Sequence, residues 1–195
     1  CKPGEALVKI RDLVILDENG KHAVDGISFT LRKGEILGIA GVEGNGQTEL
    51  VEAMTGMGGY TSGTIEIGGK DIQGSSVAAI RALKVAHIPE DRMTMGIAPK
   101  LSLTENMIAD KLSWKKFFKN GIINRKAVRS YGEEMVDQYQ VLCKSQDVSI
   151  DSLSGGNIQK VVLARELSGD PQGSLPISRP VVWMSVQRNL SASAW

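Results

Sequence analysis

The chain has 195 residues, 42% of them hydrophobic and 23% charged, so it can bury a full core and suits one domain with room for a subdomain. The net charge of +1 gives no electrostatic reason to expect nucleic acid or another acidic partner. Cys1 and Cys143 make no disulfide framework, which favours a reducing compartment. No apolar run approaches the roughly 20 residues that cross a bilayer. The first five residues lack a signal peptide's apolar core and indicate a linker inside a longer polypeptide.

The first forty residues carry the patterns of β-strands. Residues 6–16 alternate in hydrophobicity, Asn19-Gly20 is a two-residue hairpin signal, and residues 24–31 place apolar side chains on one face. Residues 35–40 form a short apolar run bounded by glycine, which predicts a strand buried on both faces. The chain is therefore expected to open as an antiparallel layer that leads into a buried strand.

The remaining chain up to residue 171 alternates between helical and strand patterns. A helix over residues 48–55, strands over 63–67 and 84–88, and a short helix over 75–82 form an expected α/β core. Three further helices are expected, with caps at Thr104-Glu105, Asn124 and Ser154 and ends near residues 109, 141 and 167. The order of these elements predicts an α/β fold with a helical insert.

One glycine-rich motif lies between the expected buried strand and the helix that follows it. It reads Gly41-Val42-Glu43-Gly44-Asn45-Gly46-Gln47-Thr48 and matches G-x-x-x-x-G-x-[ST], the frame of a phosphate loop. Glycines let backbone N–H groups surround phosphate oxygens, and the helix N-terminus adds positive potential. Thr48 stands where a hydroxyl binds Mg²⁺, whereas Gln47 replaces the usual lysine and brings no charge. A glycine turn between a strand and a helix is also common as plain structure. The nucleotide-binding candidates are Gly41, Gly44, Asn45, Gly46, Gln47 and Thr48.

A second motif, Leu-Ser-Gly-Gly-Asn-Ile-Gln-Lys at residues 153–160, opens the last expected helix. A serine hydroxyl and two glycine amides at a helix N-terminus form an anion site. A cap followed by a flexible turn explains Ser-Gly-Gly but not the whole string. Ser154, Gly155, Gly156 and Asn157 are therefore the second set of nucleotide-binding candidates.

This string resembles the signature of ABC ATPases, and the resemblance runs from about residue 5 to residue 171. The chain is most similar to the second half of the tandem ATPases of sugar and nucleoside importers, the ribose-type and basic-membrane-protein-type systems. The similarity rests on the lysine-free phosphate loop, Ala-His-Ile-Pro-Glu-Asp-Arg at residues 86–92, and Leu-Ser-Gly-Gly-Asn-x-Gln-Lys. The resemblance implies a P-loop NTPase core of ABC type with an antiparallel β layer and a helical subdomain over about residues 101–155.

The resemblance also implies roles for residues around the two motifs. Glu90 stands where the family has a glutamine that links the metal to the membrane subunit, so Thr48 and Glu90 are the metal candidates. Without the family context, residues 90–92 would be a solvated charged turn. Residues 93–103 would face the permease. The adenine-stacking aromatic of the family is missing from residues 5–22, where His22 is either a substitute or an ordinary surface histidine.

The tail departs from the family pattern after Pro171. Residues 173–180 contain two prolines and no strand periodicity, so they are not expected to form a central strand. Dropping two bases from a back-translation of residues 177–190 permits Gln-Pro-Thr-Arg-Gly-Leu-Asp-Val-Gly-Ala-Thr-Glu-Phe, which follows the family pattern. We therefore expect a domain over residues 1–171, and a frameshifted, loosely packed tail over 172–195 that leaves the core sheet incomplete. Resequencing the coding DNA tests this, because an intact gene for this tail would exclude it.

The resemblance implies a nucleotide-binding half that binds ATP with Mg²⁺ and donates its signature to a partner nucleotide-binding domain, the first half of the same polypeptide. Transmembrane permease subunits would be the other partners, with no nucleic acid involved. The location would be the cytoplasmic face of the plasma membrane. No catalytic set is complete in the chain, so the isolated chain is expected to be inactive. The alternatives are a soluble ABC-type ATPase acting on ribosomes or DNA, and a truncated fragment without enzymatic function.

Overall fold

The computed structural model describes residues 4–42, 44–89, 91–111, 114–119, 122–169, 173–178 and 181–185. The described residues form two compact units. The first holds residues 4–89 together with the strands at 173–178 and 181–185, and the second holds residues 91–169. No helix among the described residues is both long enough and apolar enough to cross a membrane.

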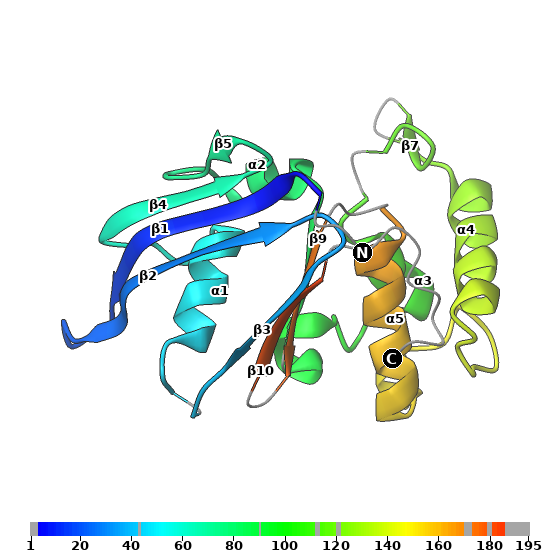
Figure 1. Cartoon of the computed structure of the whole chain (residues 1–195). Helices are drawn as coiled ribbons and strands as arrows, with labels where there is room; N and C mark the ends of the chain where they lie inside the picture. Colours follow the sequence, from blue (N-terminus) through cyan, green and yellow to red (C-terminus); the bar gives the residue numbers. More distant parts are fainter. Residues whose placement is uncertain are drawn as a thin grey trace. The chain divides into compact units, whose positions relative to one another are not determined.

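The first unit opens with the antiparallel layer expected from the sequence (Figure 1). The strands stand in the order β2-β1-β4-β5, with bounds His22–Arg32, Ala6–Leu16, Ser62–Ile67 and Lys70–Asp71. Asp17 fixes the hairpin between β1 and β2, because its Oδ1 accepts the N–H groups of Asn19 and Lys21 at 2.8 Å each. Gly20 follows with a φ of 74°, which only glycine adopts without strain. The predicted hairpin is confirmed.

The core of the first unit lies between this layer and α1 (Gln47–Thr55). Leu13 of β1, Ile65 of β4 and two residues of α1, Val51 and Met54, are all 0% exposed. The helix predicted over residues 48–55 is confirmed, and it buries Leu50, Val51 and Met54. This packing fixes the helix that follows the glycine-rich loop.

A second sheet of the first unit has the strand order β3-β10-β9-β6. Its strands are Ile36–Ala40, Val181–Ser185, Gly173–Ser178 and Val85–Ile88, in that order. The prediction that β3 is buried on both faces is wrong, since Ile36 is 58% exposed. The physical reason is its position, because β3 pairs on one side only, with β10, among the described strands.

The expectation that residues 173–180 provide no central strand is also wrong. β9 pairs in parallel with β6 and in antiparallel with β10, so both tail strands lie inside the sheet. Pro176 removes one donor from the ladder, but pairing continues on both sides of it, at Leu175 with His87 and at Ile177 with Val182. Sheet pairing at neighbouring residues outweighs the missing donor. The rest of the tail lies outside the described residues.

The remaining helices and short strands complete the two units. The first unit also holds α2, and the second holds a π-helical turn η1, two short strands, α3, α4, a 3₁₀ turn η2 and α5. Their bounds are α2 Val77–Ala82, η1 Arg92–Gly96, α3 Leu103–Ile108, β7 Phe118–Lys119, β8 Ile122–Ile123, α4 Arg125–Gln138, η2 Ile150–Ser152 and α5 Gly155–Leu167.

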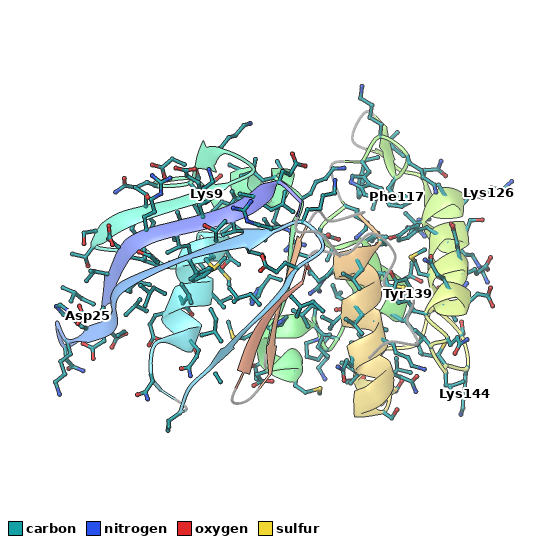
Figure 2. All side chains as sticks on the ribbon, viewed as in Figure 1. Lys9, Asp25, Phe117, Lys126, Tyr139 and Lys144 are labelled. Carbon is teal, nitrogen blue, oxygen red and sulfur yellow. The ribbon has the colours of Figure 1, made fainter. Side chains whose placement is uncertain are left out.

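The second unit packs around aromatic and aliphatic side chains. Phe117 is 0% exposed and Tyr139 5% exposed, and both point into the unit, while Lys126 and Lys144 point outward (Figure 2). The ring of Phe117 lies 5.1 Å from the ring of Tyr131, within the range of favourable aromatic contact. This core holds α3, α4 and α5 together.

Candidate functional site

The helix N-termini of the chain fall into two groups. In α2, α3 and α4 the cap side chain accepts a backbone N–H of the first turn, from Ser76, Ser102 and Asn124 respectively. The α3 cap is Ser102 rather than the expected Thr104-Glu105, because Ser102 and Glu105 form a complete capping box. Among the described α-helices, α1 and α5 begin without a side-chain cap, after Gly46 and Ser154. These are the two helices that follow the glycine-rich motifs.

An open helix N-terminus has a definite chemical meaning. The first backbone N–H groups of a helix have no partner inside the helix, and they carry partial positive charge. A capping side chain satisfies one or two of these groups, and those left without a cap bind water or an anion. Capping side chains bond the first turn of α2, α3 and α4, so among the described α-helices an uncapped start is found at the two motifs.

Geometry explains the glycines of the first motif. Gly44 and Gly46 have φ values of 85° and 90°, a region that other residues rarely adopt. A Cβ on Gly46 would also overlap the backbone carbonyl of Ala23 in β2. The Leu50 N–H donates to the Gly46 carbonyl at 2.9 Å, so α1 starts directly after this turn. The loop therefore needs glycine for its own conformation.

Gln47 closes the same loop from within. Its Nε2 donates to the Val42 carbonyl at 3.2 Å, and its side chain covers Gly41, where a Cβ would overlap the amide. The Asn45 N–H donates to the same Val42 carbonyl, also at 3.2 Å. Thr48 is exposed in the first turn of α1. The loop thus offers backbone N–H groups and a hydroxyl, with a neutral amide where a lysine would supply charge.

The second motif has glycines that its own fold does not require. Gly155 and Gly156 are exposed and lack a positive φ. A Cβ built on either residue would meet no atom within 4 Å. Glycine in a helix is less favourable than alanine by about 0.8–1.0 kcal/mol. Neither steric crowding nor backbone conformation therefore requires glycine at these two positions.

Asn157 connects the second motif to the segment after α4. Its Oδ1 accepts the Leu142 N–H at 2.9 Å, and its Nδ2 donates to the Ser154 Oγ at 3.0 Å. Close by, the Lys160 ammonium donates to the Gln140 carbonyl at 2.8 Å. The sequence does not predict that Gln140 and Leu142 contact this motif, because they bond through backbone groups to residues 15 or more positions away.

A buried ammonium holds the other end of α5. The Lys111 Nζ donates to the Arg165 carbonyl and to the Asp110 carboxylate, at 2.7 Å each, and its side chain is 1% exposed. Burial lowers the pKa of Lys111, an effect that the Asp110 carboxylate opposes. No sequence motif marks this lysine, which donates to a carbonyl in the last turn of the helix.

Other predicted site residues stand apart from these two motifs. His22 is exposed, and its Nδ1 lies 2.7 Å from an Asp25 carboxylate oxygen, a contact that fits the surface alternative. Glu43 and Glu90 lie outside the described residues, so the metal role of Glu90 stays a prediction. The described residues contain no cluster of three or more metal-ligating side chains. The first motif belongs to the first unit and the second motif to the second unit.

The fold and the motifs define a class of protein. A glycine-rich loop leads from a sheet strand into a helix with an open N-terminus, and a second open helix begins with Ser-Gly-Gly in a helical unit. This combination is that of an ATP-binding cassette. The family model described as ABC transporter matches residues 24–175, most of the chain. The chain belongs to the ABC transporter family.

Similar proteins carry import functions in their names. The chain is 36% identical over 186 residues to the nucleoside import ATP-binding protein NupA of Lactococcus lactis subsp. cremoris, a match that covers 95% of this chain and 37% of the relative. It is 31% identical over 170 residues to the ribose import ATP-binding protein RbsA of Chromobacterium violaceum, covering 87% of this chain and 32% of the relative. The chain thus spans about a third of the length of these relatives.

Solved structures support the fold. The ADP conformation of MJ1267, an ATP-binding cassette of an ABC transporter, matches with a TM-score of 0.66 at 18% identity, covering 86% of this chain and 66% of that one. The dimeric structure of MJ0796, a bacterial ABC transporter cassette, matches with a TM-score of 0.70 at 16% identity, covering 87% and 73%. The predicted ABC-type α/β fold is confirmed.

Proposed function

We propose that this chain is a nucleotide-binding half of an ATP-driven importer for simple sugars or nucleosides. The observation that carries the proposal is the pair of open helix N-termini, at Gly46 and at Ser154, in a chain that caps its other described α-helices with side chains. The names of the relatives favour import of these solutes. The remaining partners would be permease subunits, with the chain attached peripherally at the cytoplasmic face of the plasma membrane.

The second motif would act on a nucleotide held by another domain. We call that domain the partner half, meaning the other nucleotide-binding half of the same importer subunit. The Ser154 hydroxyl and the N–H groups of Gly155 and Gly156 are exposed and would donate to the terminal phosphate of its ATP. The space beside both glycines lets a phosphate approach the backbone closely.

The first motif would hold the chain's own ATP, with Thr48 and Glu90 as candidate ligands of Mg²⁺. Its catalytic contribution would be weak, because the Gln47 amide brings no positive charge to the transferring phosphoryl group. We therefore expect negligible ATPase activity from the isolated chain. Sustained Mg²⁺-dependent turnover by pure material would contradict this expectation.

Two measurements test the proposal. Mg-ATP should raise the melting temperature of the chain, since a ligand that binds the native state stabilises it. ATP should also strengthen association with the partner half in sedimentation velocity, and Ser154→Ala should weaken that association without lowering the thermal shift. A chain that shows neither response would be a fragment without function. A thermal shift without ATP-dependent association would exclude the signature role.

A further inference from the structure

Two helices of the second unit begin with serine and differ in the residue three positions later. In α3 the Ser102 Oγ accepts the Glu105 N–H at 3.2 Å and donates its own proton to the Glu105 carboxylate at 2.8 Å. In α5 the corresponding residue is Asn157, and the Ser154 Oγ accepts from its Nδ2 at 3.0 Å. A serine stands at the N-cap of both helices. Ser102 donates its proton to the side chain three residues later, whereas Ser154 accepts a hydrogen bond from that side chain.

The two serine hydroxyls differ in whether they keep a proton to donate. A hydroxyl has one proton to donate and two lone pairs that accept. Glu105 takes the proton of Ser102 and the helix takes one lone pair, so that serine has no proton left to donate to a phosphate. An amide N–H instead donates to Ser154, which leaves the proton of the Ser154 hydroxyl free for an acceptor. The first N–H groups of α5 also stay uncapped by the side chain.

The position of the Asn157 amide is itself fixed from the other side. Its Oδ1 accepts the Leu142 N–H at 2.9 Å, so the carbonyl faces this segment and the NH₂ group faces Ser154. The Lys160 ammonium holds the same segment through the Gln140 carbonyl at 2.8 Å. Gln140 has a φ of 52°, an uncommon value for a residue other than glycine, which places this segment in a defined turn.

We propose that Asn157 is a positioning residue that holds Ser154 out of its own helix cap, so that the serine proton and the first N–H groups of α5 remain available to a phosphate. The inference rests on the proposed function for the identity of the phosphate, the terminal phosphate of ATP on the partner half. It assigns to Asn157 a role through Ser154, fixed by the segment at residues 140–142, in place of direct contact with nucleotide.

The first test needs no nucleotide. In the unmodified chain the backbone N–H of residue 157 should exchange quickly with solvent, because Ser154 does not accept it. In Asn157→Ala the serine is free to swing back and cap the helix, and exchange at residue 157 should slow by about tenfold, the equivalent of about 1.4 kcal/mol. Slow exchange at this amide in the unmodified chain, or no change in the variant, would overturn the proposal.

The second test is a double-mutant cycle on ATP-dependent association with the partner half. Asn157→Asp keeps an acceptor for the Leu142 N–H but takes the proton of Ser154, as Glu105 does in α3. It should weaken association by about tenfold or more, the scale of one charge-assisted hydrogen bond. In a Ser154→Ala background the same substitution should have little further effect, because the proton is already gone.

The outcomes separate the two proposals. Equal losses from Asn157→Asp in both backgrounds would mean that the new carboxylate acts by charge alone, and the positioning role would be wrong. If the unmodified chain shows no ATP-dependent association, the proposed function fails, while the exchange test still decides whether Asn157 controls Ser154. Asn157→Gln is the matched conservative variant. It should associate more tightly than Asn157→Asp because it retains an amide donor.

Discussion

Gly156→Ala should stabilise the folded chain but weaken its association with the partner half. Gly156 is the second residue of α5, it lacks a positive φ, and an added Cβ would meet no atom within 4 Å. Alanine lowers the conformational entropy of the unfolded chain and favours the helix, so we expect the free energy of unfolding to rise by about 0.4–1 kcal/mol. Urea denaturation measures this gain.

The same methyl group should weaken association with the partner half. It occupies the space through which a phosphate would reach the backbone N–H of Gly156. The loss of one hydrogen bond to a charged group is about 1.5–3 kcal/mol, which corresponds to roughly 10- to 150-fold in the dissociation constant. Sedimentation velocity with ATP and the partner half would measure this change.

Gly46→Ala is the matched control. Gly46 has a φ of 90° and stands against the Ala23 carbonyl, so its substitution should lower the free energy of unfolding by about 1–3 kcal/mol. The two glycine substitutions are therefore expected to shift stability in opposite directions. The reasoning is refuted if Gly156→Ala destabilises the chain, or if it leaves ATP-dependent association unchanged.

Three other substitutions test other parts of the structure. Gln47→Lys should tighten ATP binding about tenfold in titration calorimetry, because a charged donor replaces the amide that now bonds the Val42 carbonyl. Weaker ATP binding by this variant would exclude phosphate binding at this loop. Lys111→Met should lower the free energy of unfolding by about 1–3 kcal/mol in urea, because the Arg165 carbonyl and the partly exposed Asp110 carboxylate each lose a hydrogen bond from a buried ammonium, and a change under 0.5 kcal/mol would contradict this. Hydrogen bonds from the backbone and hydroxyl of Ser102 lower the pKa of Glu105, so this carboxylate contributes stability above its unfolded pKa that is lost as pH falls through the lower folded pKa. Glu105→Gln should flatten the acid limb of the stability curve, and an unaltered limb would argue against that contribution.

Local chemistry made much of the fold predictable from sequence. The hairpin at Asn19-Gly20 and the cap at Asn124 use side chains and dihedral preferences within a few residues of the turn or helix they shape. The helix periods of α1 and α4 likewise follow from short-range spacing. Such features need no knowledge of the rest of the chain, so the pattern alone predicts them.

The errors arose where distant segments decide the outcome. β9 is a strand because β6 and β10 pair with it, and the hydrophobic pattern of residues 173–178 does not predict that pairing. Similarly, Lys111 meets the Arg165 carbonyl across 54 positions, a contact that only the packed second unit creates. Tertiary pairing can override both the proline signal and the usual exclusion of charge from a core.

Glycine posed a subtler problem, since the motifs contain glycines of two kinds. Gly46 is needed by the chain itself, because its φ and the nearby Ala23 carbonyl exclude a side chain. Gly156 is surrounded by open space, and the chain would be more stable with alanine there. Residue identity alone does not distinguish these cases. The φ angle and the space around the Cα separate a glycine that the fold requires from one that the fold merely tolerates.

The two motifs also differ in how they treat their own hydrogen-bonding groups. In the first, the Gln47 Nε2 donates a hydrogen bond to the Val42 carbonyl of the same loop, so a donor that could bind phosphate is used within the loop. In the second, the Asn157 amide donates to the Ser154 hydroxyl, so this bond does not use the serine proton. Under the proposed function, the chain would therefore contribute more to the nucleotide of its partner half than to its own. That asymmetry predicts that substitutions at Ser154 reduce turnover of the assembled importer more than substitutions at Gln47 do.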